Sequence, residues 1–261
     1  MLYPRIIPCL LVHNKGLVKT VKFKEGKYVG DPINAVKIFN EKEVDELMVL
    51  DIDATVEDRE PDYKMIENLA VECRMPLCYG GGIKTVVQAE KIFSLGVEKI
   101  AISSAVIENP TIVQELAQKV GTQSVVVVLD VKKKMFGGYE VLTHNATKKT
   151  GINPIKLTKD LEELGIGEIV VNSVDNDGLM RGYDFNIIDK IKEIATVPVT
   201  ILGGAGSLSD IRAVIKRYGI IGISAGSLFV FKGKYKAVLI NYPKYDEKEK
   251  IMKENFRGIK I

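Results

Sequence analysis

Short apolar runs alternate with longer amphipathic segments along almost the whole chain. The helix-like segments gather apolar residues on one face, as Ala35, Val36 and Phe39 do after Pro32. The apolar runs are strand-sized and rich in Val, Ile and Leu, as is typical of parallel strands buried on both faces. They cover residues 5–11, 46–51, 76–79, 99–103, 124–130, 168–173, 197–202 and 220–224. Eight strand–helix alternations in 261 residues predict an α/β fold, a (β/α)8 TIM barrel rather than an open doubly wound sheet.

Three segments depart from this alternation. After the first run we expect a long polar loop that reaches to about Asp31. Residues 135–149 are rich in Gly, Tyr and Thr and alternate in polarity, which predicts a hairpin insertion. The tail from Lys232 is charged and rich in Tyr, and its Tyr242-Pro243 step predicts that any last helix is short.

The second half of the chain repeats the first, element by element. The repeat pairs residues 10–12 with 129–131, 50–51 with 174–175, 80–82 with 203–205, and 103–104 with 225–227. We therefore expect a single barrel domain over residues 1–261, built from half-barrels at about 1–120 and 121–261. Corresponding turns of the two halves would then lie on opposite sides of one mouth.

Each half carries a glycine turn followed by a small-residue turn. A strand that delivers a glycine turn into a helix N-terminus presents free backbone N–H groups to an anion. Both glycine turns are followed about 20 residues later by a second turn, which in each half contains a serine. The pairing predicts two phosphate cradles and an elongated ligand with a phosphate at each end. The candidate ligand-binding residues are Lys19, Gly81, Gly82, Ser103, Ser104, Asp177, Gly178, Gly203, Gly204, Gly226 and Ser227.

Composition narrows the class of protein. With 46% hydrophobic and 27% charged residues the chain is an ordinary globular one, and its net charge of +3 gives no reason to expect a nucleic-acid partner. No apolar run is long enough to span a membrane, and the first residues lack a signal-peptide core, so we expect a cytoplasmic protein. Cys9, Cys73 and Cys78 have no CxxC spacing and the two histidines are not grouped, so we expect no disulfide, metal or cofactor.

Carboxylates at the ends of the predicted strands are the candidates for chemistry. Asp130 and Asp177 lie between the two phosphate cradles, where they could transfer protons at an imine or a sugar carbon. The alternative is that an Asp after an apolar run forms a turn or a helix cap. Lys19 could neutralise a phosphate or lie exposed to solvent, and the sequence leaves both open. His13 and His144 fall in predicted loops, where we expect surface residues rather than bases.

These motifs together resemble the cyclase subunit of imidazole glycerol phosphate synthase, over essentially the whole chain. The shared motifs include Gly-Gly-Gly-Ile at 80–83, Asp-Asn-Asp-Gly at 175–178 and Gly-Gly-Ala-Gly at 203–206. The resemblance implies a barrel that takes ammonia from a glutaminase docked at the amino-terminal face and passes it to the phosphate-binding mouth. It further implies an ammonia gate and a partner contact, with Arg5, Glu46, Lys99 and Glu168 as the gate and Glu98 at the partner interface.

The chain departs from that family at the reaction centre. The family's acid/base pair is two aspartates, of which Asp130 matches the second, whereas Leu11 stands at the position of the first. Leucine can neither donate nor accept a proton, and the loss of one such group costs roughly 10²–10⁴-fold in rate. Leu179 and Leu202 also replace two hydroxyls that help the family's phosphate turns. The predicted ammonia entrance is therefore complete, while the predicted cyclase chemistry is not.

This combination is similar to a divergent branch of the family, the acetamidino-sugar modification proteins of surface-polysaccharide and nonulosonate gene clusters. The segment 236–243 also resembles that branch. It implies a barrel that supplies ammonia to a separate ATP-using amidotransferase-like enzyme, which converts an N-acetyl group on a nucleotide-linked sugar to an acetamidino group.

Two alternatives stay open at this point. One is a true cyclase of histidine biosynthesis in which Asp51, Asp175 or His13 replaces the missing aspartate. The other is a non-catalytic scaffold that binds a phosphorylated ligand and activates its glutaminase. The chain has no Cys-His-Glu triad pattern for glutamine hydrolysis, so each reading requires a separate glutaminase.

Overall fold

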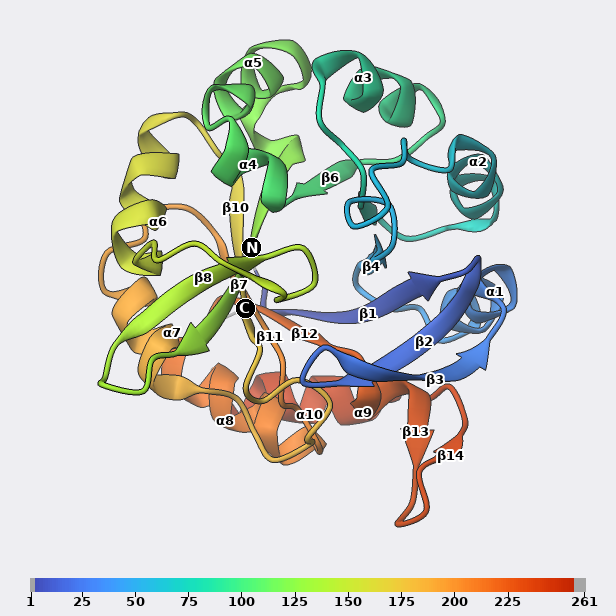
Figure 1. The fold of residues 1–261 in the computed structure, drawn as a ribbon. Coiled ribbons are helices and arrows are strands. Elements are labelled where there is room, and N and C mark those ends of the chain that lie inside the picture. Colours follow the sequence, from blue (N-terminus) through green and yellow to red (C-terminus); the bar gives the residue numbers. More distant parts are fainter. Residues whose placement is uncertain (1–2, 256–261) are drawn as a thin grey trace.

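The structure is a computed structural model that describes residues 3–255, in which eight parallel strands close into one barrel (Figure 1). Each barrel strand pairs in parallel with the next, and β12 pairs back to β1. In order around the barrel they are β1 (Arg5–His13), β4 (Leu47–Asp51), β5 (Leu77–Gly80), β6 (Lys99–Ile102), β7 (Val125–Lys133), β10 (Glu168–Ser173), β11 (Val199–Leu202) and β12 (Gly222–Ala225). The predicted TIM barrel is confirmed.

Helices form a ring around the strands (Figure 1). Local signals fix where several of them begin: Asp31 and Asn153 cap helices that start with proline, and Thr85 and Ser207 form capping boxes. The outer helices are α1 (Pro32–Glu41), α2 (Tyr63–Glu72), α3 (Val86–Ser94), α5 (Thr111–Val120), α6 (Pro154–Glu163), α7 (Phe185–Lys192), α8 (Leu208–Tyr218) and α10 (Tyr245–Asn255). Two short helices, α4 (Ser104–Glu108) and α9 (Ser227–Val230), and the 3₁₀ turn η1 (Thr122–Ser124) complete the set.

The strands separate two apolar cores. Alternation along β1 sends Ile6 and Leu10 outward, into the core between strands and helices, and Ile7 and Cys9 inward. The inner cluster fills the barrel with apolar side chains, namely Ile7, Cys9, Met48, Cys78, Ala101, Val126, Val128, Val170 and Leu202. The barrel interior is therefore apolar between its two ends.

Two antiparallel hairpins are inserted after β1 and β7. The segment that we expected to be a polar loop before Asp31 is instead the hairpin of β2 (Gly16–Val21) and β3 (Lys24–Gly30), which pairs with β1. The hairpin predicted over 135–149 is present as β8 (Tyr139–Thr143) and β9 (Lys148–Lys149), paired with the end of β7. The loop expectation failed because Leu17 and Val18 bury themselves against the barrel despite their polar neighbours. The first strand of each half, β1 and β7, is followed by a hairpin, which agrees with the predicted half-barrel repeat. The repeat itself stays a prediction.

The tail after α9 also differs from expectation. A small hairpin of β13 (Phe231–Lys232) and β14 (Ala237–Val238) projects from the rim, and α10 follows it (Figure 1). The expectation of a short last helix is wrong, because Pro243 precedes the eleven-residue helix instead of interrupting it. The Tyr242 hydroxyl donates to the Ile6 carbonyl at 2.8 Å and fastens this segment to the barrel. Within residues 3–255, no helix is both long and apolar enough to cross a bilayer.

Candidate functional site at the carboxyl ends of the strands

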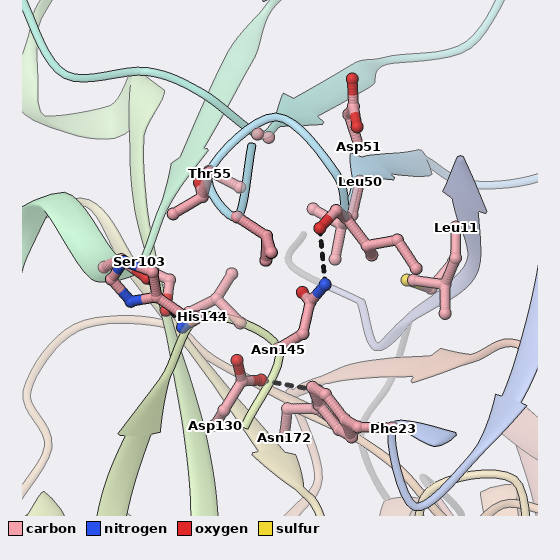
Figure 2. A pocket seen from close by; sticks show the side chains of 18 of the residues that line it. Leu11, Phe23, Leu50, Asp51, Thr55, Ser103, Asp130, His144, Asn145 and Asn172 are labelled. Atoms are coloured by element: carbon pink, nitrogen blue, oxygen red, sulfur yellow. Dashed lines mark hydrogen bonds between the residues drawn. The ribbon is translucent and has the colours of Figure 1, made fainter. Parts of the chain in front are cut away.

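The carboxyl ends of the barrel strands surround a cavity of about 430 Å³. Figure 2 shows that side chains from β1, β4, β7 and β10 point into it, together with the turns that follow these strands. In a TIM barrel this is the face on which ligands bind. The cavity brings together all of the predicted ligand-binding residues except Gly203, which is not part of its lining.

The first predicted cradle joins the turn after β5 to the start of α4. Gly81 and Gly82 have φ of +123° and +73°, and a Cβ at Gly81 would lie 2.4 Å from the Asp51 carbonyl oxygen. Only glycine fits there, because the turn packs directly against the end of β4. The Gly82 backbone N–H donates to the Thr55 hydroxyl oxygen at 3.5 Å. Ser103 and Ser104 lie opposite, at the beginning of α4, and the Ser104 Oγ accepts a hydrogen bond from the His144 backbone N–H at 3.2 Å.

The second predicted cradle joins the turn after β11 to the start of α9. Gly204 has a φ of +116°, and its ideal Cβ would lie 2.2 Å from the Gly182 carbonyl oxygen. Gly226 and Ser227 lie next to it in the cavity lining. A Cβ at Gly226 would lie 2.4 Å from the Lys19 Nζ, so the ammonium group rests directly on this turn.

Lys19 is a buried residue of β2 and not a solvent-exposed one. Only 5% of it is exposed, its Nζ donates to the Cys9 carbonyl at 2.5 Å, and burial lowers its pKa. The position beside Gly226, in the small-residue turn of the second cradle, fits the reading in which Lys19 meets a phosphate. The exposed alternative left open by the sequence is thereby excluded.

Asp130 and Asn172 form the polar part of the cavity floor (Figure 2). They face each other across β7 and β10, and the Asn172 Nδ2 donates to the Asp130 Oδ1 at 2.8 Å. Burial raises the pKa of Asp130 to about 7, with a further contribution from the nearby Asp177 charge. Leu11 and Leu50 complete the floor with apolar side chains, so Asp130 has no carboxylate partner at the end of β1.

Asp177 is tied to the first hairpin. Its Oδ2 accepts from the Thr20 hydroxyl at 2.9 Å and from the Phe23 backbone N–H at 3.3 Å. Burial raises the pKa of Asp177, although these hydrogen bonds oppose the shift. The carboxylate thus positions the β2–β3 turn, from which Phe23 reaches the cavity, and Gly178 follows it against the Thr20 carbonyl.

A ring of four charged side chains closes the opposite end of the barrel. Arg5 donates to both Glu46 and Glu168, with 2.7 Å to the Glu168 Oε1, and the Lys99 Nζ lies 3.0 Å from an oxygen of each glutamate. The Thr200 hydroxyl adds a hydrogen bond to Glu168. Although burial opposes it, the charges of Arg5 and Lys99 hold the pKa of Glu168 below its usual value. The four residues that the sequence proposed as a gate are therefore brought together.

Glu98 lies on the same amino-terminal side, immediately before β6. It is exposed, and its carboxylate accepts a hydrogen bond from the Leu77 backbone N–H at 2.8 Å. Its assignment to a partner interface stays a prediction.

Sequence reasoning misjudged several residues of the mouth. His144, expected at the surface, and Asn145 line the cavity from the β8–β9 turn, where the Asn145 Nδ2 donates to the Ile52 carbonyl at 2.6 Å (Figure 2). Asn172 was not singled out, although its place two residues after the buried Val170 put it on the inward face of its strand. The alternation of polar and apolar residues in 135–149 predicts a hairpin, but it does not indicate that the turn of this hairpin lines the cavity.

The carboxylates and histidine named for the cyclase alternative are dispersed. Asp51 is buried in the cavity lining, and burial raises its pKa. His13 lies outside the lining with its Nδ1 2.6 Å from the Asp53 Oδ1, and Asp175 accepts from the Lys133 backbone N–H at 2.9 Å. Of these three, only Asp51 borders the cavity.

The amino-acid sequence matches known proteins over most of its length. The family model described as "Histidine biosynthesis protein" matches residues 5–236. A protein of Vibrio vulnificus, provisionally named imidazole glycerol phosphate synthase subunit hisF3, is 60% identical over 97% of both chains. A provisionally named subunit HisF of Leptospira interrogans is 59% identical over 95% of this chain and 98% of its own. The imidazole glycerol phosphate synthase subunit HisF of Natranaerobius thermophilus is 38% identical over 93% of this chain and 96% of its own.

Proposed function

The chain belongs to the histidine biosynthesis family that contains the HisF subunits of imidazole glycerol phosphate synthase, and from this premise we propose that it is an ammonia-delivering barrel that has lost cyclase chemistry. The barrel receives ammonia from a glutaminase at its amino-terminal face and supplies it for acetamidino modification of a nucleotide-linked surface-polysaccharide or nonulosonate sugar. A separate ATP-using enzyme of the amidotransferase type activates that sugar. The single observation that carries the proposal is a complete charged ring at one end of the barrel and Leu11 at the other.

The charged ring supports the entrance of the route. Glu46 and Glu168 are almost fully buried, and burying carboxylates is costly unless cations and hydrogen bonds satisfy them. A barrel that needed only stability could fill this end with apolar side chains. The ring leads directly onto the apolar barrel interior, through which a neutral molecule passes more readily than an ion.

The mouth supports the loss of cyclisation. Cyclisation of the substrate by general acid–base catalysis needs two protein groups that exchange protons with it. Asp130 can do so, because burial raises its pKa to about 7, but Leu11 cannot. The Asp177 Oδ2 accepts hydrogen bonds from the β2–β3 hairpin, so this oxygen is not available to accept a proton from the substrate as a replacement base.

The two glycine turns support a ligand with phosphate groups. Both turns border the cavity and have glycines with positive φ, and Lys19 adds a buried ammonium group beside Gly226, in the small-residue turn of the second cradle. A nucleotide-linked sugar carries at least one phosphate group, which a cradle of this kind can bind. The family resemblance and the cradles favour the same class of anionic ligand.

A true cyclase of histidine biosynthesis is the second candidate. The observation that favours it is Asp51, a buried carboxyl group that borders the same cavity as Asp130. Against it, the Asp51 Oδ1 accepts from the backbone N–H groups of Asp53 and Ala54 at 2.9 and 3.1 Å, which engages this oxygen with its own loop.

A cyclase assay separates the two candidates. The purified chain and its Leu11→Asp variant are supplied with saturating ammonium salt and the two-phosphate ribulosyl-formimino substrate of the family. We expect no turnover by the natural chain and measurable turnover by Leu11→Asp, in which a carboxylate again faces Asp130. Robust turnover by the natural chain would contradict the proposal and favour the histidine enzyme.

A further inference from the structure

Strand β10 connects the charged ring to the mouth through its inward-facing residues. Glu168 belongs to the ring, Val170 to the apolar interior and Asn172 to the cavity floor. At about 3.3 Å per residue, Asn172 lies roughly 13 Å along the strand from Glu168. On the neighbouring strand β7, Val128 and Asp130 pair with Val170 and Asn172. The Asp130–Asn172 pair therefore lies where the apolar interior opens into the cavity.

The Asn172 side chain holds a buried acceptor that the protein does not satisfy. Only 6% of Asn172 is exposed, and its Nδ2 donates to Asp130. Its Oδ1 is buried and accepts no hydrogen bond from any residue between 3 and 255. Leaving such an oxygen unpaired costs about 1–3 kcal/mol. An unsatisfied acceptor on a residue that lines a cavity points to a ligand that donates to it.

The surroundings of this oxygen restrict what that ligand can be. Gly203 follows the neighbouring strand β11, and an ideal Cβ there would lie 3.0 Å from the Asn172 Oδ1, so a side chain at this position would press against the oxygen. Leu202, which pairs directly with Asn172, has no donor, and neither does Leu11. Among residues 3–255, the side chain that hydrogen-bonds to Asn172 is that of Asp130, so a donor to the Oδ1 would have to come from a small ligand with N–H or O–H groups.

We propose that the Asn172 Oδ1 and the Asp130 carboxyl group form a binding site for ammonia, as NH₃ or NH₄⁺, at the exit of the barrel interior. The inference rests on the ammonia route proposed above and names the last site on it. Ammonia has three N–H donors and one lone pair, so it can donate to Asn172 and still accept from a protonated carboxyl group. Ammonium can donate to both groups at once.

The protonation state of Asp130 suits both forms. Burial raises its pKa to about 7, so protonated and ionised carboxyl groups coexist near neutral pH. Asp177 adds negative charge nearby, and the buried Lys19 lies between Asp177 and Cys9. An uncharged molecule arriving through the apolar interior would thus be held at the mouth until the activated sugar is in place.

A titration of the isotope-labelled full-length chain with ammonium chloride tests this site. The side-chain amide signals of Asn172 and the carboxyl ¹³C signal of Asp130 are followed by NMR at constant pH and ionic strength, with sodium chloride replacing the ammonium salt in the control. We expect a saturable shift of both signals with ammonium and none with sodium. Tetramethylammonium, which has no N–H group, should also leave them unchanged.

Variants separate the ammonia site from an ordinary water site. Asn172→Val removes the acceptor, and we expect the ammonium affinity read at Asp130 to fall about tenfold or more, the effect of one charge-assisted hydrogen bond. Asn172→Ser, which also withdraws the amide oxygen, gives the same readout if the valine variant does not fold. Asn34→Val, at an exposed position on the outer helix α1, is the matched control and should bind ammonium as the natural chain does.

Two results would overturn the proposal. One is a response to ammonium no larger than the response to sodium, as a site that holds only water would give. The other is an unchanged affinity in Asn172→Val. Because this titration uses free ammonium and no glutaminase, its outcome is independent of the route: ammonium binding without transfer of glutamine nitrogen would keep the site and refute the proposed function.

Discussion

Replacing Glu168 by glutamine removes one negative charge from the ring and keeps the shape of the side chain. The ring then holds Arg5 and Lys99 against Glu46 alone, a net charge of +1 in a largely buried place. Removing one partner of a buried ion pair costs about 3–5 kcal/mol. Because the Arg5 and Lys99 side chains are 28% and 20% exposed, solvent screens part of this, and we expect about 3 kcal/mol.

Thermal unfolding followed by circular dichroism measures the loss. For a chain of this size about 3 kcal/mol corresponds to a drop in Tm of roughly 6–12 °C at neutral pH. The loss should depend on pH, because the pKa of Glu168 is lower in the folded than in the unfolded chain. Its contribution is complete above the unfolded pKa of about 4.3 and disappears as the pH falls through the lower folded value. The Tm difference between the two proteins should therefore shrink below about pH 4.

The matched control is Glu115→Gln, which removes the same charge from an exposed position on α5. It should change the stability by no more than about 0.5 kcal/mol. The reasoning is refuted if Glu168→Gln unfolds within the range of this control at neutral pH, or if the gap between Glu168→Gln and the natural chain stays constant down to pH 3.

Three further outcomes are expected. Asp130→Asn should be more stable than the natural chain at pH 8 and equally stable near pH 4. The reason is that the raised pKa of Asp130 makes its ionisation oppose folding as the pH rises towards about 7. Tm values of both proteins measured across this pH range check the prediction. Lys19→Met should weaken the binding of inorganic phosphate, measured by calorimetry, about tenfold, since the second cradle loses the buried ammonium group beside Gly226. Gly204→Ala should lower the free energy of unfolding by more than about 3 kcal/mol, because its Cβ would meet the Gly182 carbonyl oxygen. Gly137→Ala, which has positive φ but open space around it, should lower it by about 1–2 kcal/mol. Chemical denaturation compares the two variants, and equal losses of stability would count against the clash.

The barrel was predictable because the relevant signals are local. Continuous runs such as 125–129 and the capping residues Asp31 and Thr85 state where strands and helices lie without knowledge of their neighbours. The hairpin at 16–30 was not predictable, because most of its residues are polar and only a few apolar side chains, Leu17, Val18 and Val29, are buried against the barrel. Likewise Pro243 marks a boundary, but which side of it is helical depends on packing against the barrel.

The candidate site was predictable in its residue types and less so in their relations. Glycines with required positive φ and charges at the starts of strands are readable from sequence. The burial of Lys19 and the hydrogen bond between Asp130 and Asn172 are not, because both arise from contacts between strands that are distant in the chain. The orphaned amide oxygen of Asn172 could be found only after every neighbouring donor had been placed.

The central claim is that ammonia enters at the charged ring and leaves at the mouth without being consumed by this chain. The most direct measurement supplies the chain, its glutaminase and the sugar-activating enzyme with amide-¹⁵N glutamine in the presence of excess unlabelled ammonium. The account predicts that the acetamidino group carries mainly ¹⁵N with the natural chain and loses this preference when Glu168→Gln disturbs the ring. A product labelled only in proportion to the mixed ammonia pool, with the natural chain and variant alike, would contradict it.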